Sequence, residues 1–259
     1  MNTSQLRVFA RGLDHPEGIA WAPSGWVACG GEAGQIYHVD LESGSARVVA
    51  NTGGFVLGLA LDGDENIYAC DMALNALVRI DHATGAIHDV TTGRLQEPLV
   101  NPNFPVFAAD GRLFFSASGV WGARDGRILC LSPAGDLTVV SVGASSFTNG
   151  LAIDPEGKHL YVVESQEPRL GRFPLTDEGL GEYELLVEIP RTVPDGLAFC
   201  ADGRLLIGCY RPDRVLIWDG RNLDVLADDW TGEDMSAPTN LAFVGHQRER
   251  LLTANLAGW

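Results

Sequence analysis

Four oxygen-bearing side chains recur in register along the chain: Glu17, Asn103, Asn149 and Asp195. The last three are each 46 residues apart, and all four precede a short apolar segment by the same distance. The set contains no His or Cys. Carboxylate and carboxamide oxygens with a net charge of about −2, completed by water, are the donors that Ca²⁺ or Mg²⁺ prefers. The pattern therefore predicts that these residues bind one divalent metal ion.

A structural explanation competes with this prediction. Asn and Asp are common at strand ends and in turns, where their side chains bond the local backbone. Glu17 is harder to explain in that way, because a buried carboxylate without a partner is costly.

The four residues belong to a segment that occurs six times in the chain. Each copy contains a short apolar strand, a turn rich in Asp, Gly and Pro, and a second strand of β-branched and aromatic residues. A third strand and a Gly-containing hairpin follow in most copies, which indicates four antiparallel strands per unit. The equivalent position, hereafter the ligand column, recurs at intervals of 40, 46, 46, 46 and 44 residues and is occupied by Glu17, Leu57, Asn103, Asn149, Asp195 and Thr239.

Four-stranded units of ~40–50 residues are typical of β-propellers, whereas the repeats of β-solenoids are shorter. Six units predict an all-β, six-bladed β-propeller that forms a single domain over residues 1–259. The last unit supplies only two strands before the chain ends, so the last blade is expected to be incomplete. We expect residues 6–13 to add its outer strand and close the ring, which leaves one strand missing, as in a chain shortened from a longer one.

The charge balance argues against two classes of partner. The sequence has 34 acidic and 18 basic residues, a net charge of −16, which repels nucleic acids and anionic membrane surfaces. The N-terminus lacks the pattern of a signal peptide, and no run approaches the roughly 20 apolar residues of a membrane span. The five cysteines have no CxxC spacing and lie mostly in apolar strands, as reduced buried thiols do. We expect a cytoplasmic protein.

The sequence around the ligand column resembles a known family. The segments PEGIAW, NPNF, TNGLAI and PDGLAF are similar to motifs of the gluconolactonase/regucalcin (senescence marker protein) family of six-bladed propellers, and the resemblance runs from His15 to the end of the chain. Diisopropyl fluorophosphatase and the drug-responsive lactonases belong to the same broader group. The resemblance implies that Glu17, Asn149 and Asp195 bind a divalent metal and that Asn103 lies near both metal and substrate.

One motif departs from the family pattern. Sugar lactonases show R-x-N-D where this chain has Asn101, Pro102, Asn103 and Phe104. The Arg that would contact a sugar acid is absent, and an aromatic ring replaces the Asp. We therefore expect Asn101, Asn103 and Phe104 to contact a lactone or ester less polar than an aldonolactone.

The predicted reaction is hydrolysis of a cyclic ester. A divalent ion polarises the lactone carbonyl and stabilises the oxyanion that forms as water attacks. Asp195 is the first choice to take the proton from water, as the resemblance also implies. Asn103 and Asn149 would orient the acyl oxygen, and Glu17 would act mainly as a ligand. Ca²⁺ is the expected metal, although such a site also accepts Mg²⁺, Mn²⁺ or Zn²⁺.

Loops that join the second and third strands should open at the same end as the ligand column. Trp121 and Tyr210 in these loops, with Phe104 and Phe147, could line an apolar pocket, or they could fill gaps between blades. Three further roles stay open: Asp71 and Glu164 either add a metal contact or satisfy loop amides, and His15 either approaches the pocket or lies in a solvated turn.

Two other functions use the same scaffold. A phosphotriesterase-like hydrolase would place the metal and the two asparagines on a phosphoryl oxygen. A non-catalytic calcium-binding propeller would use the ion only to close the channel. The sequence leaves the natural substrate and the oligomeric state open.

Overall fold

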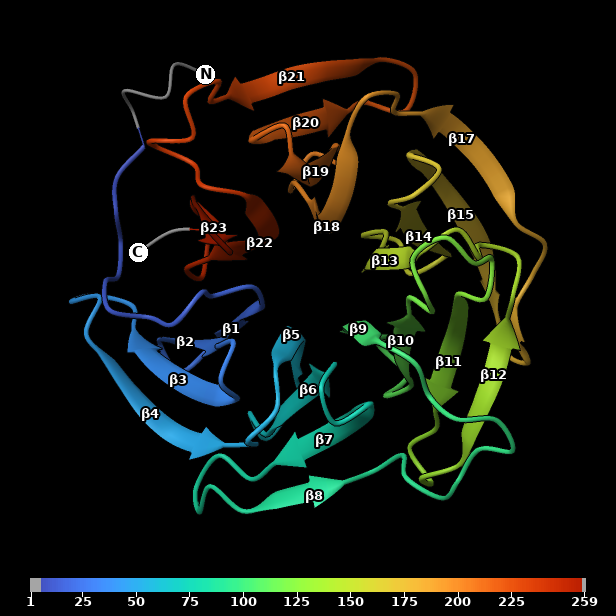
Figure 1. Ribbon diagram of the computed structural model, residues 1–259, viewed down its shortest axis with the longest axis horizontal. Coiled ribbons are helices and arrows are strands. Elements are labelled where there is room, and N and C mark those ends of the chain that lie inside the picture. The colour runs from blue at the N-terminus through green and yellow to red at the C-terminus, as the bar shows by residue number, and fades with distance from the viewer. Residues whose placement is uncertain (1–5, 258–259) are drawn as a thin grey trace.

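Six antiparallel sheets stand around one axis in the computed structural model, which describes residues 6–257 (Figure 1). Five of the sheets carry the four strands of a blade, one of them with an additional short strand, and the sixth has two strands. The chain is thus the six-bladed β-propeller that its repeats predict.

The strands of each blade follow one another outward from the axis (Figure 1). The inner strands are β1 (Ile19–Ala22), β5 (Val56–Leu61), β9 (Pro102–Phe107), β13 (Thr148–Ile153), β18 (Val193–Phe199) and β22 (Pro238–Val244). The second strands are β2 (Trp26–Gly30), β6 (Ile67–Asp71), β10 (Leu113–Ala117), β14 (His159–Glu164), β19 (Leu205–Arg211) and β23 (Arg250–Asn255). The third strands are β3 (Gln35–Asp40), β7 (Ala76–Ile80), β11 (Arg127–Leu131), β15 (Arg169–Thr176) and β20 (Arg214–Trp218). The outer strands are β4 (Ala46–Asn51), β8 (Ile87–Asp89), β12 (Leu137–Ser141), β17 (Glu184–Glu188) and β21 (Leu223–Asp228), and β16 (Gly179–Leu180) pairs with the end of β15.

The hydrophobic core is divided among the contacts between neighbouring blades. We number the blades 1 to 6 in chain order. One cluster joins blades 1 and 2 through Trp26, Ile36, Val56 and Ile67. Five further clusters fill the remaining contacts around the ring, including the one between blades 6 and 1. Second strands such as β2 and β10 are buried along their whole length because blades cover both of their faces, whereas the outer strand β8 is exposed throughout.

Turn chemistry in the repeats explains the hairpins at the outer edge. In the β3–β4 turn, Asp40 Oδ1 accepts hydrogen bonds from the amide (2.7 Å) and hydroxyl (2.6 Å) of Ser43. Asp81 does the same for Thr84 in the β7–β8 turn, at 2.8 and 2.7 Å. The glycine that follows in each turn has a positive φ, which costs other residues energy.

The sixth blade differs from the prediction in one respect. Among residues 6–257 its sheet contains only β22 and β23, and residues 6–13 run beside it without forming a strand. Phe9 and Leu13 instead pack on the cluster between blades 6 and 1, and Leu6 packs on the cluster between blades 5 and 6. The predicted outer strand is therefore wrong. The segment covers the blade through side-chain burial, because its apolar residues reach two neighbouring interfaces at once.

Two expectations from composition can be compared with the structure. All five cysteines are free thiols, and four of them are buried, as predicted. Within residues 6–257, no helix has the length and hydropathy to cross a membrane.

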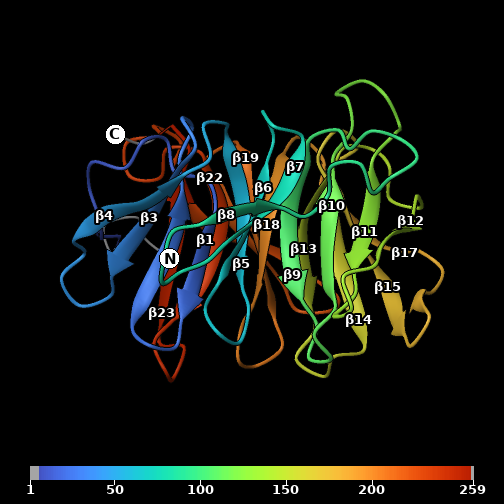
Figure 2. The same ribbon diagram turned by 90° about the horizontal axis from the view of Figure 1, so that it is seen from below.

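Loops gather at the two ends of the ring (Figure 2). Because successive strands are antiparallel, the connections into each inner strand lie at the same end as the loops between second and third strands. We call this end the mouth. The ligand column lies there, at the beginning of the inner strands.

Neighbouring inner strands approach one another closely at the ligand column. A Cβ atom on Gly150 would fall well inside 3.0 Å of the carbonyl oxygen of Asp195, and one on Gly18 would collide in the same way with Leu57. Each of these glycines directly follows a column residue. The absence of a side chain here brings the backbones of neighbouring blades together, so that the preceding side chains converge on the axis.

A substitution tests this close approach. We expect Gly150→Ala to lower the free energy of unfolding by about 2–3 kcal/mol, because the obstructing atom is backbone and must move. Gly63→Ala is the matched control, since a Cβ there meets nothing within 4 Å and its φ is not positive; it should change stability by less than about 0.5 kcal/mol. Urea denaturation measures both, and equal stability of the two variants would contradict the argument.

Candidate metal centre

The column residues lie in β-bulges. In blade 4, Thr148 pairs with Glu164 and Leu151 pairs with Val162, so Asn149 and Gly150 together oppose one residue. The same two-against-one irregularity interrupts β5, β9, β18 and β22 at their column residues. Bulges redirect side chains that a regular strand would point at the neighbouring sheet. In β1 the ladder begins at Ile19, so Glu17 lies just before it.

The four predicted ligands are buried, and several of their oxygens have no partner. Glu17, Asn103, Asn149 and Asp195 are only 4–6% exposed. Among the described residues, nothing donates a hydrogen bond to Oδ1 of Asn103, Asn149 or Asp195. Unpaired buried oxygens are uncommon and costly in folded proteins. Oxygens at equivalent bulges of blades 3, 4 and 5 suit a hard divalent cation.

Glu17 and Asp195 influence each other across the channel. Burial raises the pKa of Glu17 well above its usual value, and the charge of Asp195 raises it further. Burial also raises the pKa of Asp195, from 3.8 to about 7. Within residues 6–257, neither carboxylate forms an ion pair with a basic side chain. The site therefore concentrates negative charge that protons or a cation must neutralise.

A serine sets the orientation of the Asn149 amide. Asn149 Nδ2 donates to Ser165 Oγ (3.0 Å), and Ser165 Oγ donates to the carbonyl of Pro194 (2.7 Å). Because the amide nitrogen is used in this way, the oxygen is the atom left unpaired. Ser165 also ties blade 4 to the residue that precedes Asp195, so it links two of the four predicted ligands.

Comparison with known proteins gives the family of the chain. The profile of the SMP-30/gluconolactonase/LRE-like region family matches residues 16–255. The chain belongs to this family. The lactonase Drp35 of Staphylococcus haemolyticus is 22% identical over 255 residues, covering 76% of this chain and 77% of that protein.

Two solved structures of similar proteins share the fold. A gluconolactonase from Xanthomonas campestris has a TM-score of 0.81 at 21% identity, with 95% of this chain and 85% of the other covered. A calcium-binding protein of Agrobacterium tumefaciens, regucalcin, has a TM-score of 0.80 at 22% identity, with coverage of 96% and 84%. The resemblance to the gluconolactonase/regucalcin family that the motifs predict is thus confirmed.

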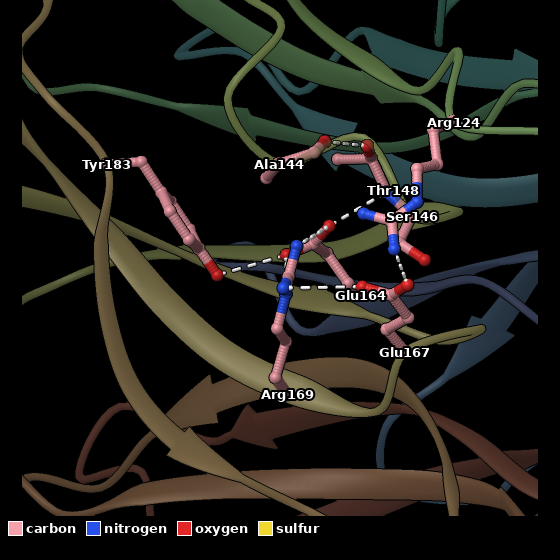
Figure 3. A network of polar contacts seen from close by, with 8 residues as sticks. All are labelled: Arg124, Ala144, Ser146, Thr148, Glu164, Glu167, Arg169 and Tyr183. Atoms are coloured by element: carbon pink, nitrogen blue, oxygen red, sulfur yellow. Dashed lines mark hydrogen bonds and ion pairs between the residues drawn. The ribbon is translucent and has the colours of Figure 1, made fainter.

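Glu164 supports the connection between β12 and β13. Its buried carboxylate accepts a hydrogen bond from the Ser146 amide (2.7 Å), is held by Arg169 (Nη2 at 2.8 Å), and accepts one from the Tyr183 hydroxyl (3.0 Å) (Figure 3). These partners surround the carboxylate. Of the two roles left open for Glu164, the structure favours the support of loop amides over a metal contact.

Asp71 has the equivalent role in blade 2. It accepts hydrogen bonds from the Thr52 hydroxyl (2.6 Å) and from the amides of Phe55 (3.0 Å) and Leu74 (2.9 Å). His15 lies partly buried in blade 1, with Nδ1 2.9 Å from Asp14 Oδ1 and 3.1 Å from Glu32 Oε2. It is therefore part of a partly exposed group with two carboxylates, in a bend of the chain.

The predicted substrate residues do not all come together. Trp121 contacts Phe147 edge to face, with ring centroids 4.9 Å apart, and Asn101 Nδ2 donates to the carbonyl of Gly119 in the loop of Trp121 (2.8 Å). Tyr210 lies at the end of β19. The guanidinium carbon of Arg211 lies over its aromatic ring, 4.7 Å from the centroid of the Tyr210 ring. No contact of the described residues places Tyr210 beside Trp121.

Phe104 lies in the core. Its ring packs in the cluster between blades 3 and 4 and is 9% exposed. This burial argues against the direct substrate contact that we predicted, because the ring fills the blade contact instead. The cause is visible in the repeat: the position after the column residue is Gly in blades 1, 2, 4 and 5, and in blade 3 a large apolar residue occupies it.

Sequence reasoning missed two polar residues of the centre. Ser165 has no signal in the sequence, since its role depends on Asn149 and Pro194. Asn240 is 1% exposed and follows the column residue Thr239. Its Nδ2 has no partner among the described residues. The departure from Gly at this position of the repeat could have identified Asn240.

The buried carboxylates predict an unusual pH dependence for the metal-free protein. The folded state holds a proton on Asp195 up to about pH 7, whereas the usual value is 3.8, so this residue contributes stability at low pH that is lost as the pH rises through that range. The melting temperature of Asp195→Asn in EDTA should therefore be compared with that of wild type at two pH values. The difference should favour the variant by several degrees more at pH 8 than at pH 5. Thermal melts measure this difference, in which the contributions of surface carboxylates cancel. A difference in melting temperature that does not change with pH would contradict the raised pKa of Asp195.

Removing the serine tests the orientation of the ligand. We expect Ser165→Ala to weaken Ca²⁺ binding by about 10-fold or more, because the Asn149 amide is then free to rotate. Ser132→Ala, in the β11–β12 turn at the opposite end of the ring, is the control and should bind as wild type does. Isothermal titration calorimetry measures both, and unchanged affinity in Ser165→Ala would show that the serine does not position the ligand.

Proposed function

We propose that this protein is a divalent-metal-dependent hydrolase that opens a lactone less polar than an aldonolactone. One observation carries the proposal: four buried oxygen-bearing side chains lie at equivalent positions at the mouth, and three of them have an oxygen without a hydrogen-bond partner among the described residues. A lactonase and a gluconolactonase among its relatives support the reaction class. The absence of the R-x-N-D arginine supports the less polar substrate.

Glu17, Asn103, Asn149 and Asp195 would hold the ion, and oxygen donors of this kind favour Ca²⁺. A relative described as a calcium-binding protein supports the same choice. When bound, the ion supplies a Lewis acid that polarises a carbonyl and stabilises the negative charge that develops on its oxygen. It also favours the ionised forms of both carboxylates and so reverses the effect of burial on their pKa values.

Asp195 is the base in the proposed reaction. Its carboxylate accepts a proton from water as the water oxygen forms a bond to the carbonyl carbon. The ring C–O bond then breaks, and the leaving oxygen takes the proton from Asp195, which yields a hydroxy acid and restores the carboxylate. Asn103 and Asn149 orient the acyl group, while Glu17 contributes charge.

Turnover of lactones tests this proposal. Proton release from a panel of lactones should require the metal and be abolished by EDTA, and Asp195→Asn should lower kcat/KM by 10²-fold or more, as loss of a general base does. Asp110→Asn, in the β9–β10 turn at the opposite end of the ring, is the matched control and should keep full activity.

Other results would identify the alternatives. If Asp195→Asn retains turnover, the assignment of the base is wrong. If the protein binds Ca²⁺ but opens no lactone, the choice falls between a phosphotriester substrate, which the same assay detects, and a non-catalytic calcium-binding role.

A further inference from the structure

Apolar side chains from neighbouring blades stand exposed at the mouth. Leu74 in the β6–β7 loop is 47% exposed, and Val120 and Trp121 in the β10–β11 loop are 53% and 55% exposed. Phe147, in the connection into β13, contacts Trp121 and is half-buried. We call these four residues the mouth ridge. Exposed apolar groups that gather beside a polar site commonly mark a place where ligand binds.

Hydrogen bonds hold the loops of the mouth ridge together. The Asn101 amide donates to Asn75 Oδ1 in the loop of Leu74 (3.0 Å), and Asn101 Nδ2 donates to the Gly119 carbonyl in the loop of Trp121 (2.8 Å). On the other side, the Gly122 amide donates to Gln166 Oε1 of blade 4 (2.8 Å). An ion pair between Arg124 and Glu167 joins the same two blades (Figure 3). The loops are therefore fixed relative to one another before any ligand binds, which lowers the entropic cost of binding.

The chain links the loops of the mouth ridge to the metal centre over short distances in sequence. Phe147 lies two residues before Asn149, and Asn101 lies two residues before Asn103. Both Asn101 and Phe147 have a left-handed backbone, with φ of 50° and 59°. That conformation is unfavourable for a bulky residue such as Phe and persists only where surrounding contacts enforce it. Here the Ser165 amide donates to the Phe147 carbonyl (3.1 Å), and the neighbouring Ser146 amide is bound by Glu164.

The composition of the mouth ridge defines what it can bind. All four side chains are uncharged. Among them, only the indole N–H of Trp121 can form a hydrogen bond with a sugar hydroxyl. We infer that the substrate is a lactone bearing an alkyl side chain, and that this chain lies across the mouth ridge while the ester is held at the metal centre. The inference rests on the proposed lactonase function and specifies its substrate class.

A chain-length series tests the inference. The Ca²⁺-loaded protein is assayed with γ-lactones from γ-butyrolactone to γ-decalactone and with glucono-δ-lactone, and kcat/KM is compared. We expect kcat/KM to rise roughly three- to four-fold for each methylene that reaches the mouth ridge, as burial of a CH₂ group does, and to be lowest for the sugar lactone.

Variants show whether the ridge is responsible for this rise. Trp121→Ala should reduce the ratio of the decalactone and butyrolactone values by about 10-fold, and Leu74→Ser should reduce it in the same direction. Trp230→Ala is the matched control, because this tryptophan is 89% exposed, lies two residues after the end of the outer strand β21, and should leave the ratio unchanged.

The outcomes separate this inference from the proposed function. Turnover of lactones with no dependence on chain length, or a dependence that Trp121→Ala and Leu74→Ser both leave intact, overturns the inference alone. Failure of the metal-loaded protein to open any lactone overturns the proposed function and the inference with it.

Discussion

Close contact between the backbones of neighbouring inner strands is the constraint on which the candidate site depends. Gly18, Gly58, Gly150 and Gly196 each lie where a Cβ would collide with a backbone carbonyl of the next blade. The column residue before each glycine therefore lies as near the axis as the ring permits. The bulges at the same positions turn the side chains out of the regular ladder. Side chains at these four positions would push neighbouring blades apart, and Glu17, Asn149 and Asp195 would move away from the axis with them.

This geometry carries an energetic cost that a cation would offset. Two carboxylates and two amide oxygens are buried in one channel, and the pKa values of Glu17 and Asp195 are raised as a result. The surrounding structure is organised to maintain the arrangement rather than to relieve it. Ser165 holds the Asn149 amide, and Glu164, itself paired with Arg169, holds the backbone that leads to it. Burial of the two carboxylates lowers the free energy of unfolding, and binding of a metal ion would offset that loss.

The mouth has two chemically different sectors around this centre. Blade 1 presents His15 between the carboxylates of Asp14 and Glu32. Blades 2 to 4 present the mouth ridge, whose loops are joined through Asn101. The left-handed backbone at His15, Asn101 and Phe147 shows that both sectors are built on constrained connections.

The sequence by itself determined the number of blades and the ligand column, because these depend on spacing, and it determined the family through its short motifs. A strand and its turns are specified by residues close in the chain, and a repeat of 40 to 46 residues places equivalent side chains at one end of a ring. Only the tertiary structure decided which atoms of those side chains remain unpaired and what surrounds them. Ser165 reaches Pro194 from 29 residues away, Phe104 turns into the contact between blades, and residues 6–13 pack as an irregular segment instead of a strand. These outcomes depend on contacts between blades, where packing of distant residues outweighs local pattern.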